Sequence, residues 1–593
     1  MLFDRYFSKY YLKYWLLFLI GIIALVVVDF FQLEIPDVVG EIVDGLSEKT
    51  LTKDVLFVLS KKMFFVAFIV FIGRFIWRIC IFGNAVKIEA DIRNDMFSHM
   101  IKLSQEKFSK NKTGAIMALY TNDLNSIRQI FGMGTMMSVD ALALGILAFY
   151  KMLKLNVVLA LVSLGPLLIV LVISNIIGRV IRRKSLLNLK AYSELSDFVQ
   201  EDYMGIGVIK AFVKEKLKLN QFKKYNQKNM DTCIAFSKDN IFVNVLISAI
   251  LTTISSLIIL IGGYYIYKSV TDTSITFTIG ELTKFSSYFG SLVWPIMAIG
   301  QLINLSSQGQ ASAKRILDLL NEEVEINDLL VKEEMKSKIE GNITFNHLTF
   351  SYPDSNKRVL EDVTFKISKG EFVGIMGATG SGKTTLVDLL VRMYNVNQNT
   401  ILIDDRDIMT IPLFDLRESI AYVTQESFLF KNTIANNICF SIDTTDIEEA
   451  KKYAILSDVD KDIEEFNDGY NTYVGERGVT VSGGQKQRIS IARALLKEAQ
   501  ILVLDDSLSA VDIITEEAIL KRLRAIREGK TTILIAHRIS TLRKLDKIIV
   551  LEDGKVNGIG SHESLLENNE IYQREVKLQE LEKEAGEYDY GKN

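Results

Sequence analysis

The sequence has little cysteine, and its net charge is close to zero. Its three cysteines, Cys80, Cys233 and Cys439, stand far apart and form neither a CxxC pair nor a metal-binding spacing. We therefore interpret them as inert thiols in a reducing compartment. A formal charge of −3 at pH 7 gives no reason to expect nucleic acid as a partner.

Proline is also scarce, with five residues in the chain and none over residues 179–239. A proline-free segment of this length predicts a helical hairpin, with its break near Gly205 and Gly207. Its first arm, residues 179–204, would extend roughly 39 Å at 1.5 Å per residue, well beyond the headgroups of a bilayer.

A second hairpin is expected over residues 84–131, with its break at residues 112–114. The two tips, residues 113–123 and 201–211, are candidates for docking on a soluble domain. The alternative is that both hairpins are merely solvated amphipathic helices.

Apolar residues are plentiful and unevenly spread. They make up 49% of the chain, and the mean hydropathy of +0.20 is high for a wholly soluble protein. A helix needs roughly 20 mainly apolar residues to cross a bilayer. Six stretches meet this requirement, all before about residue 305: Trp15–Leu33, Met63–Phe82, Met136–Met152, Val157–Ile177, Ile241–Tyr267 and Leu282–Leu305.

Basic residues indicate the orientation of these spans. Arg5, Lys9 and Lys13 precede the first span, and a basic cluster at residues 179–184 follows the fourth. The positive-inside rule then places both termini in the cytoplasm, as expected for a multi-pass protein of the plasma membrane. The first run has no obvious small-residue cleavage site, so we interpret it as a span and not as a signal peptide. The richness in Lys, Asn and Ile is typical of an AT-rich bacterial genome.

After residue 320 the chain changes character. A charged segment is followed by an apolar strand, Phe372–Met376, and then by a glycine-rich loop and an apolar helix. This is the P-loop pattern in the strand–loop–helix context that makes it specific. The backbone N–H groups of the loop and the amine of Lys383 predict binding of the ATP phosphates, and the hydroxyl of Thr384 predicts a ligand for Mg²⁺. The residues concerned are Gly377, Thr379, Gly380, Ser381, Gly382, Lys383, Thr384 and Thr385.

Two further patterns follow the P-loop. A second apolar strand, Ile501–Leu504, ends in Asp505 and Asp506, and a carboxylate at that position suits Mg²⁺. Between the two strands, a serine and two glycines stand directly before a helix, which makes an anion-binding helix N-terminus. By itself this second pattern could be only a helix cap. It consists of Ser482, Gly483, Gly484 and Gln485.

The P-loop, the VSGGQ sequence and the strand-end aspartate, in this order and behind six spans, resemble the ATP-binding cassette (ABC) exporters. The resemblance covers nearly the whole chain. It implies that Tyr352 stacks on adenine, that Gln425 contacts Mg²⁺ and the attacking water, and that His537 contacts the γ-phosphate. It also implies that Ser482–Gln485 act on the partner's ATP and that the loop with Ser509 and Asp512 meets the opposite site.

The expected fold class is a membrane α-helical domain with long cytoplasmic extensions, joined to an α/β P-loop ATP-binding cassette domain. We assign residues 1–320 to the membrane domain, 321–341 to a linker, 342–580 to the nucleotide-binding domain and 581–593 to a tail. Since one chain holds one nucleotide domain, the resemblance implies a second half-transporter as partner. ATP would then be bound between the P-loop of one subunit and the signature of the other.

The chain departs from its family at Asp506, where most active members carry glutamate. The shorter side chain sets the carboxylate back by about one bond, and a displacement of roughly 1 Å can cost on the order of a hundredfold in rate. Either a small backbone shift or a second water compensates, or the site binds ATP and hydrolyses it slowly. Because the signature is intact, we favour a heterodimer whose other chain carries the glutamate.

The resemblance implies export of small hydrophobic or amphipathic compounds, either drugs or membrane lipids. Alternatives are a homodimeric lipid or peptide exporter, a siderophore importer built on the exporter plan, and an ATP-gated regulatory membrane protein. Because no peptidase domain precedes the first span, a dedicated peptide exporter is disfavoured.

Charged residues within spans are usually paired or functional. One interpretation is a structural ion pair in which Arg74 or Arg78 meets an acid of the first span, such as Asp29 or Glu34. The other is that Asp29 or Asp140 faces the substrate pathway and attracts cations. Trp294 is a further candidate for that pathway.

Overall fold

The computed structural model describes every residue except 1–4, 111–112, 272–275, 332–337, 354, 356, 443–444, 476–480 and 591–593. At residues 5, 109–110, 113, 167–176, 178–179, 182, 270–271 and 582–590 it describes the backbone alone. Part of the expected linker (332–337), the end of the expected tail (591–593) and the side chains of Arg179 and Arg182 therefore lie outside the described residues. The chain divides into two compact units: Met1–Ile101 with Asn111–Glu322, and Lys102–Lys110 with Glu323–Asn593.

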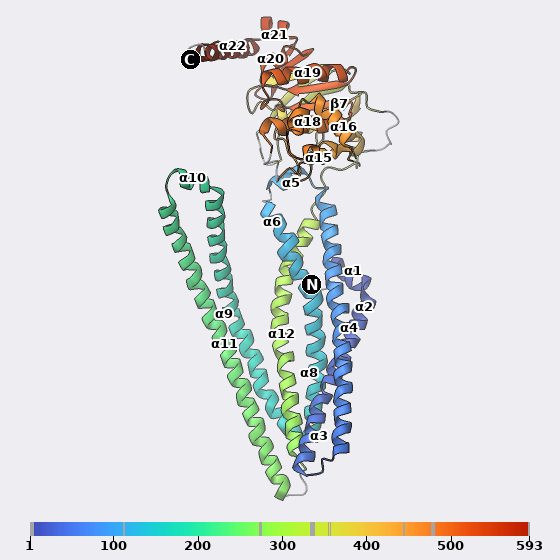
Figure 1. Cartoon of the computed structure of the whole chain (residues 1–593), viewed down its shortest axis with the longest axis vertical. Coiled ribbons are helices and arrows are strands. Elements are labelled where there is room, and N and C mark those ends of the chain that lie inside the picture. Colours follow the sequence, from blue (N-terminus) through green and yellow to red (C-terminus); the bar gives the residue numbers. More distant parts are fainter. Residues whose placement is uncertain are drawn as a thin grey trace. The chain divides into compact units, whose positions relative to one another are not determined.

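The first unit is built from helices (Figure 1). Two π-helical turns, Leu119–Asp123 and Ile130–Gly134, join three of them into one continuous run. The helices are α1 Arg5–Lys13, α2 Trp15–Gln32, α3 Glu34–Ser47, α4 Lys53–Met100, α6 Thr113–Ala118, α7 Leu124–Gln129, α8 Thr135–Leu155, α9 Val157–Met204, α10 Ile206–Ala211, α11 Glu215–Thr271 and α12 Ile279–Leu320.

These helices confirm the expected membrane domain. Among the described residues, five helical runs are long and apolar enough to cross a membrane, and they contain five of the six predicted spans. The remaining predicted span, Val157–Ile177, lies in α9, whose described apolar part is Val157–Pro166.

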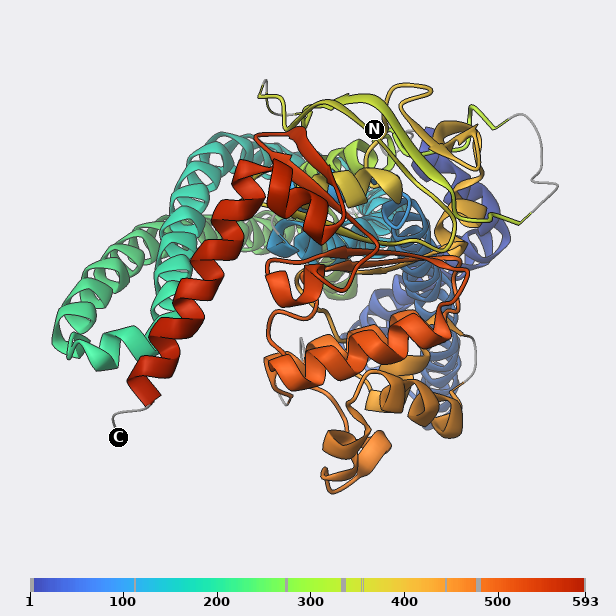
Figure 2. The same cartoon turned by 90° about the horizontal axis from the view of Figure 1, so that it is seen from above.

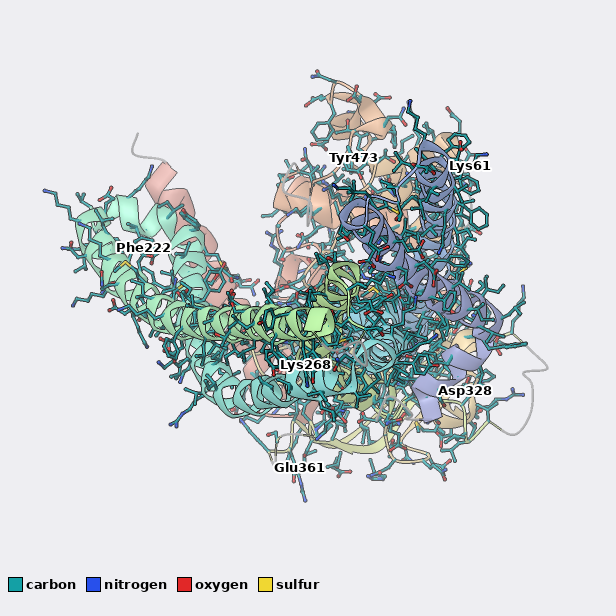
Figure 3. All side chains as sticks on the ribbon, turned by 90° about the horizontal axis from the view of Figure 1, so that it is seen from below. Lys61, Phe222, Lys268, Asp328, Glu361 and Tyr473 are labelled. Atoms are coloured by element: carbon teal, nitrogen blue, oxygen red, sulfur yellow. The ribbon has the colours of Figure 1, made fainter. Side chains whose placement is uncertain are left out.

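Helices α9 and α11 pack against each other along a long antiparallel hairpin, with α10 at its tip (Figure 1). The predicted break is confirmed, because α9 ends at Met204 and Gly205 follows it. With 57 residues, α11 is far longer than a bilayer is thick, at 1.5 Å per residue. Figure 3 labels Phe222 and Lys268 near the two ends of α11.

The second predicted hairpin differs from the expectation. Helix α4 already ends at Met100, before the break expected at residues 112–114. Asp123, in the predicted docking tip 113–123, is buried within the first unit, where Ser312 and Arg315 of α12 donate hydrogen bonds to its carboxylate. Asp123, the last residue of the predicted tip, therefore faces its own unit, and docking by the rest of the tip stays a prediction. The preceding segment, Lys102–Lys110 with helix α5 (Gln105–Lys110), groups with the second unit.

The second unit contains two sheets. A four-stranded antiparallel sheet has the order β2-β1-β4-β5, and a six-stranded sheet has the order β10-β9-β3-β8-β7-β6. In the larger sheet β6, β7, β8, β3 and β9 run parallel, and β10 is antiparallel. The strands are β1 Ile343–Phe350, β2 Leu360–Ile367, β3 Phe372–Gly377, β4 Ile401–Ile403, β5 Arg406–Asp407, β6 Ile420–Val423, β7 Ile501–Asp505, β8 Thr531–Ile535, β9 Lys547–Glu552 and β10 Lys555–Gly560.

Helices cover the parallel strands, and this explains why the central residues of those strands are mainly apolar. All five residues of β7 are buried, because both faces of a parallel sheet lie under helices. The red helix that leads to the C-terminus in Figure 2 is α22. The helices are α13 Lys383–Leu390, α14 Leu413–Glu418, α15 Ile434–Ile438, α16 Ile447–Leu456, α17 Asp460–Glu464, α18 Gly483–Leu496, α19 Ile513–Ile526, α20 Ile539–Leu542, α21 His562–Asn568 and α22 Glu570–Tyr590.

Candidate functional site

The candidate site lies at the carboxyl edge of the parallel sheet. Because β6, β7, β8 and β3 run in the same direction, the residues that follow each strand meet at one edge. The P-loop follows β3, and Asp505 is the last residue of β7, paired in register with Ile535 at the end of β8. Gln425 and His537 each lie two residues beyond their strand, β6 and β8, and both are exposed. The sheet topology thus gathers four of the predicted motifs.

The P-loop needs its glycines for two separate reasons. Gly380 and Gly382 have positive φ, at 84° and 97°, which side-chain-bearing residues rarely adopt. At Gly377, an added Cβ would lie 2.2 Å from the carbonyl oxygen of Leu551 on the neighbouring strand. The loop therefore packs directly on β9 and turns toward the site.

Lys383 is held by the loop itself. Its amine donates hydrogen bonds to the carbonyl oxygens of Gly377 and Ala378, at 2.8 and 2.9 Å. The side chain is buried, and this burial lowers the pKa of the Lys383 amine. A buried cation whose partners are neutral carbonyls is suited to exchange them for a phosphate anion.

The strand-end carboxylate fits a divalent cation. Asp505 is 1% exposed, and its Oδ2 is a buried oxygen without a hydrogen-bond partner among the described residues. The hydroxyl of Thr384 hydrogen-bonds to this carboxylate, while burial raises the pKa of Asp505. The Thr384 hydroxyl and the free Oδ2 of Asp505 are hard oxygen ligands of the kind that Mg²⁺ prefers.

Asp506 has a left-handed backbone that is anchored on both sides. Its φ is 46°, a region that aspartate tolerates better than most residues. Its N–H donates to the carbonyl of Ile535 at 3.1 Å, and its own carbonyl accepts from the Ser509 hydroxyl at 2.8 Å. Gln487 donates a longer bond, at 3.4 Å, to the same carbonyl. The position of this residue is thus set by β8 and by the loop that follows it.

His537 and Asp506 line a cavity of ≈ 160 Å³. The carbonyl of His537 accepts a hydrogen bond of 2.6 Å from the side chain of Gln579 on α22. The same side chain accepts from the N–H of Ile539 at 2.8 Å. The C-terminal helix therefore fixes the backbone on both sides of Arg538.

Tyr352 is half-buried beside the P-loop helix. Its hydroxyl is 2.8 Å from that of Thr385, and its ring lies edge-on to that of Tyr394, with 5.2 Å between centroids. The predicted adenine-contacting ring is thus held next to the helix that the P-loop opens.

The VSGGQ sequence forms the start of α18. Ser482 accepts from the N–H of Gln485, whose side chain accepts in return from the N–H of Ser482, which is a complete capping box. The helix cap considered from the sequence is therefore real. Ser482 and Gly483 are nevertheless exposed, so the helix N-terminus is open to an anion. An added Cβ at Gly484 would lie 2.9 Å from the carbonyl of Ala510.

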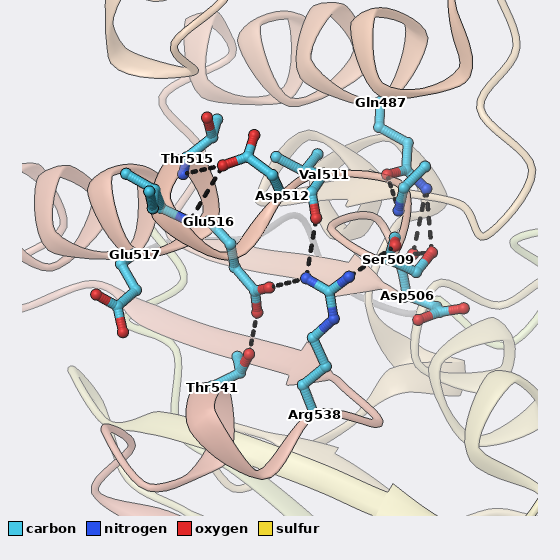
Figure 4. A network of polar contacts seen from close by, with 12 residues as sticks. Gln487, Asp506, Ser509, Val511, Asp512, Thr515, Glu516, Glu517, Arg538 and Thr541 are labelled. Carbon is cyan, nitrogen blue, oxygen red and sulfur yellow. Dashed lines mark hydrogen bonds and ion pairs between the residues drawn. The ribbon is translucent and has the colours of Figure 1, made fainter. Parts of the chain in front are cut away.

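Two residues that sequence reasoning missed hold the loop 509–512 (Figure 4). From α18, Gln487 accepts from the N–H of Ala510 at 3.0 Å and donates to the Ser509 hydroxyl at 3.3 Å. From the other side, Arg538 donates to the carbonyls of Val511 and Ser509, at 2.9 and 3.2 Å. Their places in the sequence could have pointed to them, because Gln487 lies two positions after the glutamine of VSGGQ and Arg538 directly follows His537.

Arg538 is in turn paired with the buried carboxylate of Glu516 on α19, which also accepts from Thr541. Asp512 caps α19 by accepting from the N–H groups of Ile514 and Thr515. The loop is therefore tied to α18, α19 and the segment after β8 (Figure 4).

In the membrane unit, the three predicted pathway residues come together. The indole of Trp294 on α12 donates to the carboxylate of Asp140 on α8, and Asp140 lies within hydrogen-bonding reach of Asp29 on α2.

The ion pairs expected for Arg74 and Arg78 are not what the structure shows. Arg74 donates to Gln32 at 3.1 Å.

Arg78 lies over the ring of Trp77, 5.5 Å from its centroid. Glu34, the other acid flagged near the first span, pairs with Lys151 at 2.8 Å and with Lys62 at 3.3 Å.

A P-loop ATPase domain and a domain of membrane-crossing helices in one chain define an ATP-driven membrane transporter. Comparison with known proteins gives the family. The profile described as "ABC transporter transmembrane region" matches residues 18–296, and the one described as "ABC transporter" matches residues 360–509. The chain therefore belongs to the ABC transporter family and is a fused half-transporter of the exporter type.

Individual proteins agree with this assignment. The chain is 34% identical to the probable multidrug resistance ABC transporter ATP-binding/permease protein YheI of Bacillus subtilis, over 95% of both chains. It is also 34% identical to the multidrug resistance-like ATP-binding protein MdlA of Escherichia coli, over 95% of this chain and 94% of MdlA. A solved bacterial Atm1-family ABC exporter with ATP bound shares the fold, with a TM-score of 0.79 and 23% identity over 94% of this chain and 98% of that one.

Proposed function

We propose that this chain exports hydrophobic or amphipathic compounds by alternating access and that its own P-loop site hydrolyses ATP slowly. It would act in the plasma membrane, with both termini in the cytoplasm. The multidrug relatives support the substrate class, and the apolar helical runs support the membrane location. The observation that carries the slow site is the fixed backbone of Asp506.

The nucleotide would be bound by the residues gathered at the sheet edge. Lys383 and the N–H groups of the P-loop would hold the phosphates, and Tyr352 would stack on adenine. Thr384 and Gln425 would hold Mg²⁺ beside Asp505, and His537 would contact the γ-phosphate. When bound, Mg²⁺ supplies charge neutralisation across the β- and γ-phosphate oxygens.

Slow hydrolysis follows from the reach of Asp506. Its carboxylate is about one bond shorter than that of glutamate, so it needs a backbone shift of roughly 1 Å to contact the attacking water equally well. Ile535 holds its N–H, and Ser509 and Gln487 hold its carbonyl, which opposes that shift. The structure therefore favours the slow-site interpretation over compensation by backbone movement.

A second chain is needed to complete the ATP sites. Ser482 and Gly483 are exposed at the N-terminus of α18, and we assign them to the partner's ATP. At the tip of the α9–α11 hairpin, the apolar side chains of Tyr203, Met204 and Phe212 are exposed, as expected for a surface that a partner covers.

Because the signature is intact and Asp506 replaces glutamate, we propose a heterodimer whose other chain carries the catalytic glutamate. Ser509 and Asp512 would contact the opposite site.

The test is ATP turnover by this chain alone in lipid, compared with Asp506→Glu. We expect near silence from the wild type and a gain of at least tenfold from the variant, if two copies associate. Asp553→Glu is a matched control, because Asp553 is an exposed aspartate with a φ of 44° in the β9–β10 turn. An ordinary exporter rate that glutamate does not raise would instead establish a competent Asp506 and a homodimeric pump.

A further inference from the structure

Among the described residues of the first unit, Asp29 and Asp140 form an acidic pair without a basic partner. Asp29 is 3% exposed, and its Oδ2 has no hydrogen-bond partner among the described residues. Its neighbour is a second carboxylate, Asp140, and no described lysine or arginine contributes to the electrostatic surroundings of Asp29. Asp29, Asp140 and Trp294 come from three different helices, α2, α8 and α12, which pack together.

Other acids of this unit contrast with that pair. Asp37 has Lys151 at 2.6 Å and accepts from Tyr288. Asp123, likewise buried, is paired with Arg315. Arg74, on the helix α4 that packs against α2, donates to Gln32 at 3.1 Å. Buried Asp123 and half-buried Asp37 thus each have a basic partner, whereas no described lysine or arginine pairs with Asp29.

Two neighbouring carboxylates in a low-dielectric membrane domain need a positive charge or a proton. Trp294 supplies a single N–H, which orients the Asp140 carboxylate and the indole ring but adds no charge. The indole is 41% exposed in the single chain, and Met297, one turn further along α12, is 40% exposed. An aromatic face and a soft thioether beside an anion suit an organic cation with an apolar body.

We propose that Asp29 and Asp140 form the anionic end of a binding subsite for hydrophobic organic cations, with the ring of Trp294 as its aromatic wall. This inference rests on the proposed export of amphipathic compounds and names a substrate class for it. Asp140 and Trp294 contact the cation from the open side, and buried Asp29 lies behind them within hydrogen-bonding reach of Asp140.

The test uses two probes of similar shape on the assembled transporter in lipid nanodiscs. Tetraphenylphosphonium carries a positive charge, and triphenylphosphine oxide is neutral. We expect Asp140→Asn to weaken binding of the cation at least tenfold and to change binding of the neutral probe less than twofold. Asp140→Glu, which keeps the charge, should retain cation binding within a few-fold. Glu41→Gln, which removes an exposed acid from α3, should alter neither.

The outcomes separate this inference from the export proposal. Equal binding of the cation by the wild type and by both Asp140→Asn and Asp29→Asn would overturn the subsite, even if ATP-driven export of the neutral probe is intact. An equal loss of both probes would also overturn it, because the aspartates would then act structurally. If cation binding depends on Asp140 but ATP drives export of neither probe, the subsite stands and the export proposal fails.

Discussion

Replacing Gln487 with leucine should slow ATP hydrolysis without weakening nucleotide binding at the P-loop. Gln487 makes three hydrogen bonds to the loop after Asp506, one of ordinary length at 3.0 Å and two long ones at 3.3 and 3.4 Å. An ordinary bond contributes about 1 kcal/mol and the longer ones less, so the loss is about 1–2 kcal/mol. If that energy holds the loop 509–512 in position against the opposite ATP site, hydrolysis at that opposite site should fall on the order of 5–30-fold.

The assay is steady-state ATP turnover by the assembled transporter, together with binding of a fluorescent ATP analogue. Gln487→Glu is an informative second variant, because it keeps an acceptor for the Ala510 N–H but places a carboxylate against the Asp506 carbonyl. We expect a loss at least as large. Glu528→Gln, an exposed change at the end of α19, is the control. An unchanged turnover number with a lowered melting temperature would refute the reasoning, since Gln487 would then stabilise the fold alone.

Two further predictions concern the P-loop helix. Lys383→Ala should weaken ATP binding by at least a hundredfold, because it removes the buried amine that the loop carbonyls hold; unchanged affinity in a nucleotide titration would contradict the P-loop assignment. Asp388 has its pKa raised from 3.8 to about 6 by burial, so its folded form binds a proton more tightly than the unfolded chain. Its contribution to stability is therefore full below about pH 4 and is lost as the pH rises to about 6. Asp388→Asn should flatten the fall in melting temperature over that window, and an unaltered profile would show that another group is responsible.

The residues of the candidate nucleotide site could be grouped from the sequence because strand direction does most of the positioning. Once β3, β7 and β8 are parallel, the residues after them must meet, so Lys383, Asp505 and His537 could be grouped from short local patterns. The hairpin break at Gly205 was also predictable, since its signal is local.

What could not be predicted depends on contacts between distant segments. Gln579 is 42 residues from His537, and no local pattern connects them. Lys151 pairs with Glu34 and Asp37, more than a hundred residues away, and no local pattern connects them. Hydropathy likewise does not show that Asp123, at the end of the predicted tip 113–123, faces α12. That Asp29, Asp140 and Trp294 lie together could not be predicted, because the sequence of one chain does not show which residues of different helices are neighbours.

The α9–α11 hairpin has a mechanical consequence. Its helices contact the rest of their unit near the end where Leu159 and Ile258 are buried together, and α10 lies at the other end. A rod of 57 residues is roughly 86 Å long, so a tilt of about 5° at its base carries the tip through roughly 7 Å. The hairpin therefore amplifies small movements. Rearrangements of a few tenths of an ångström among packed side chains at one end become displacements as large as a whole side chain at the other end. Stiffness along α11, which contains no proline, matters as much to this transmission as any residue at either end.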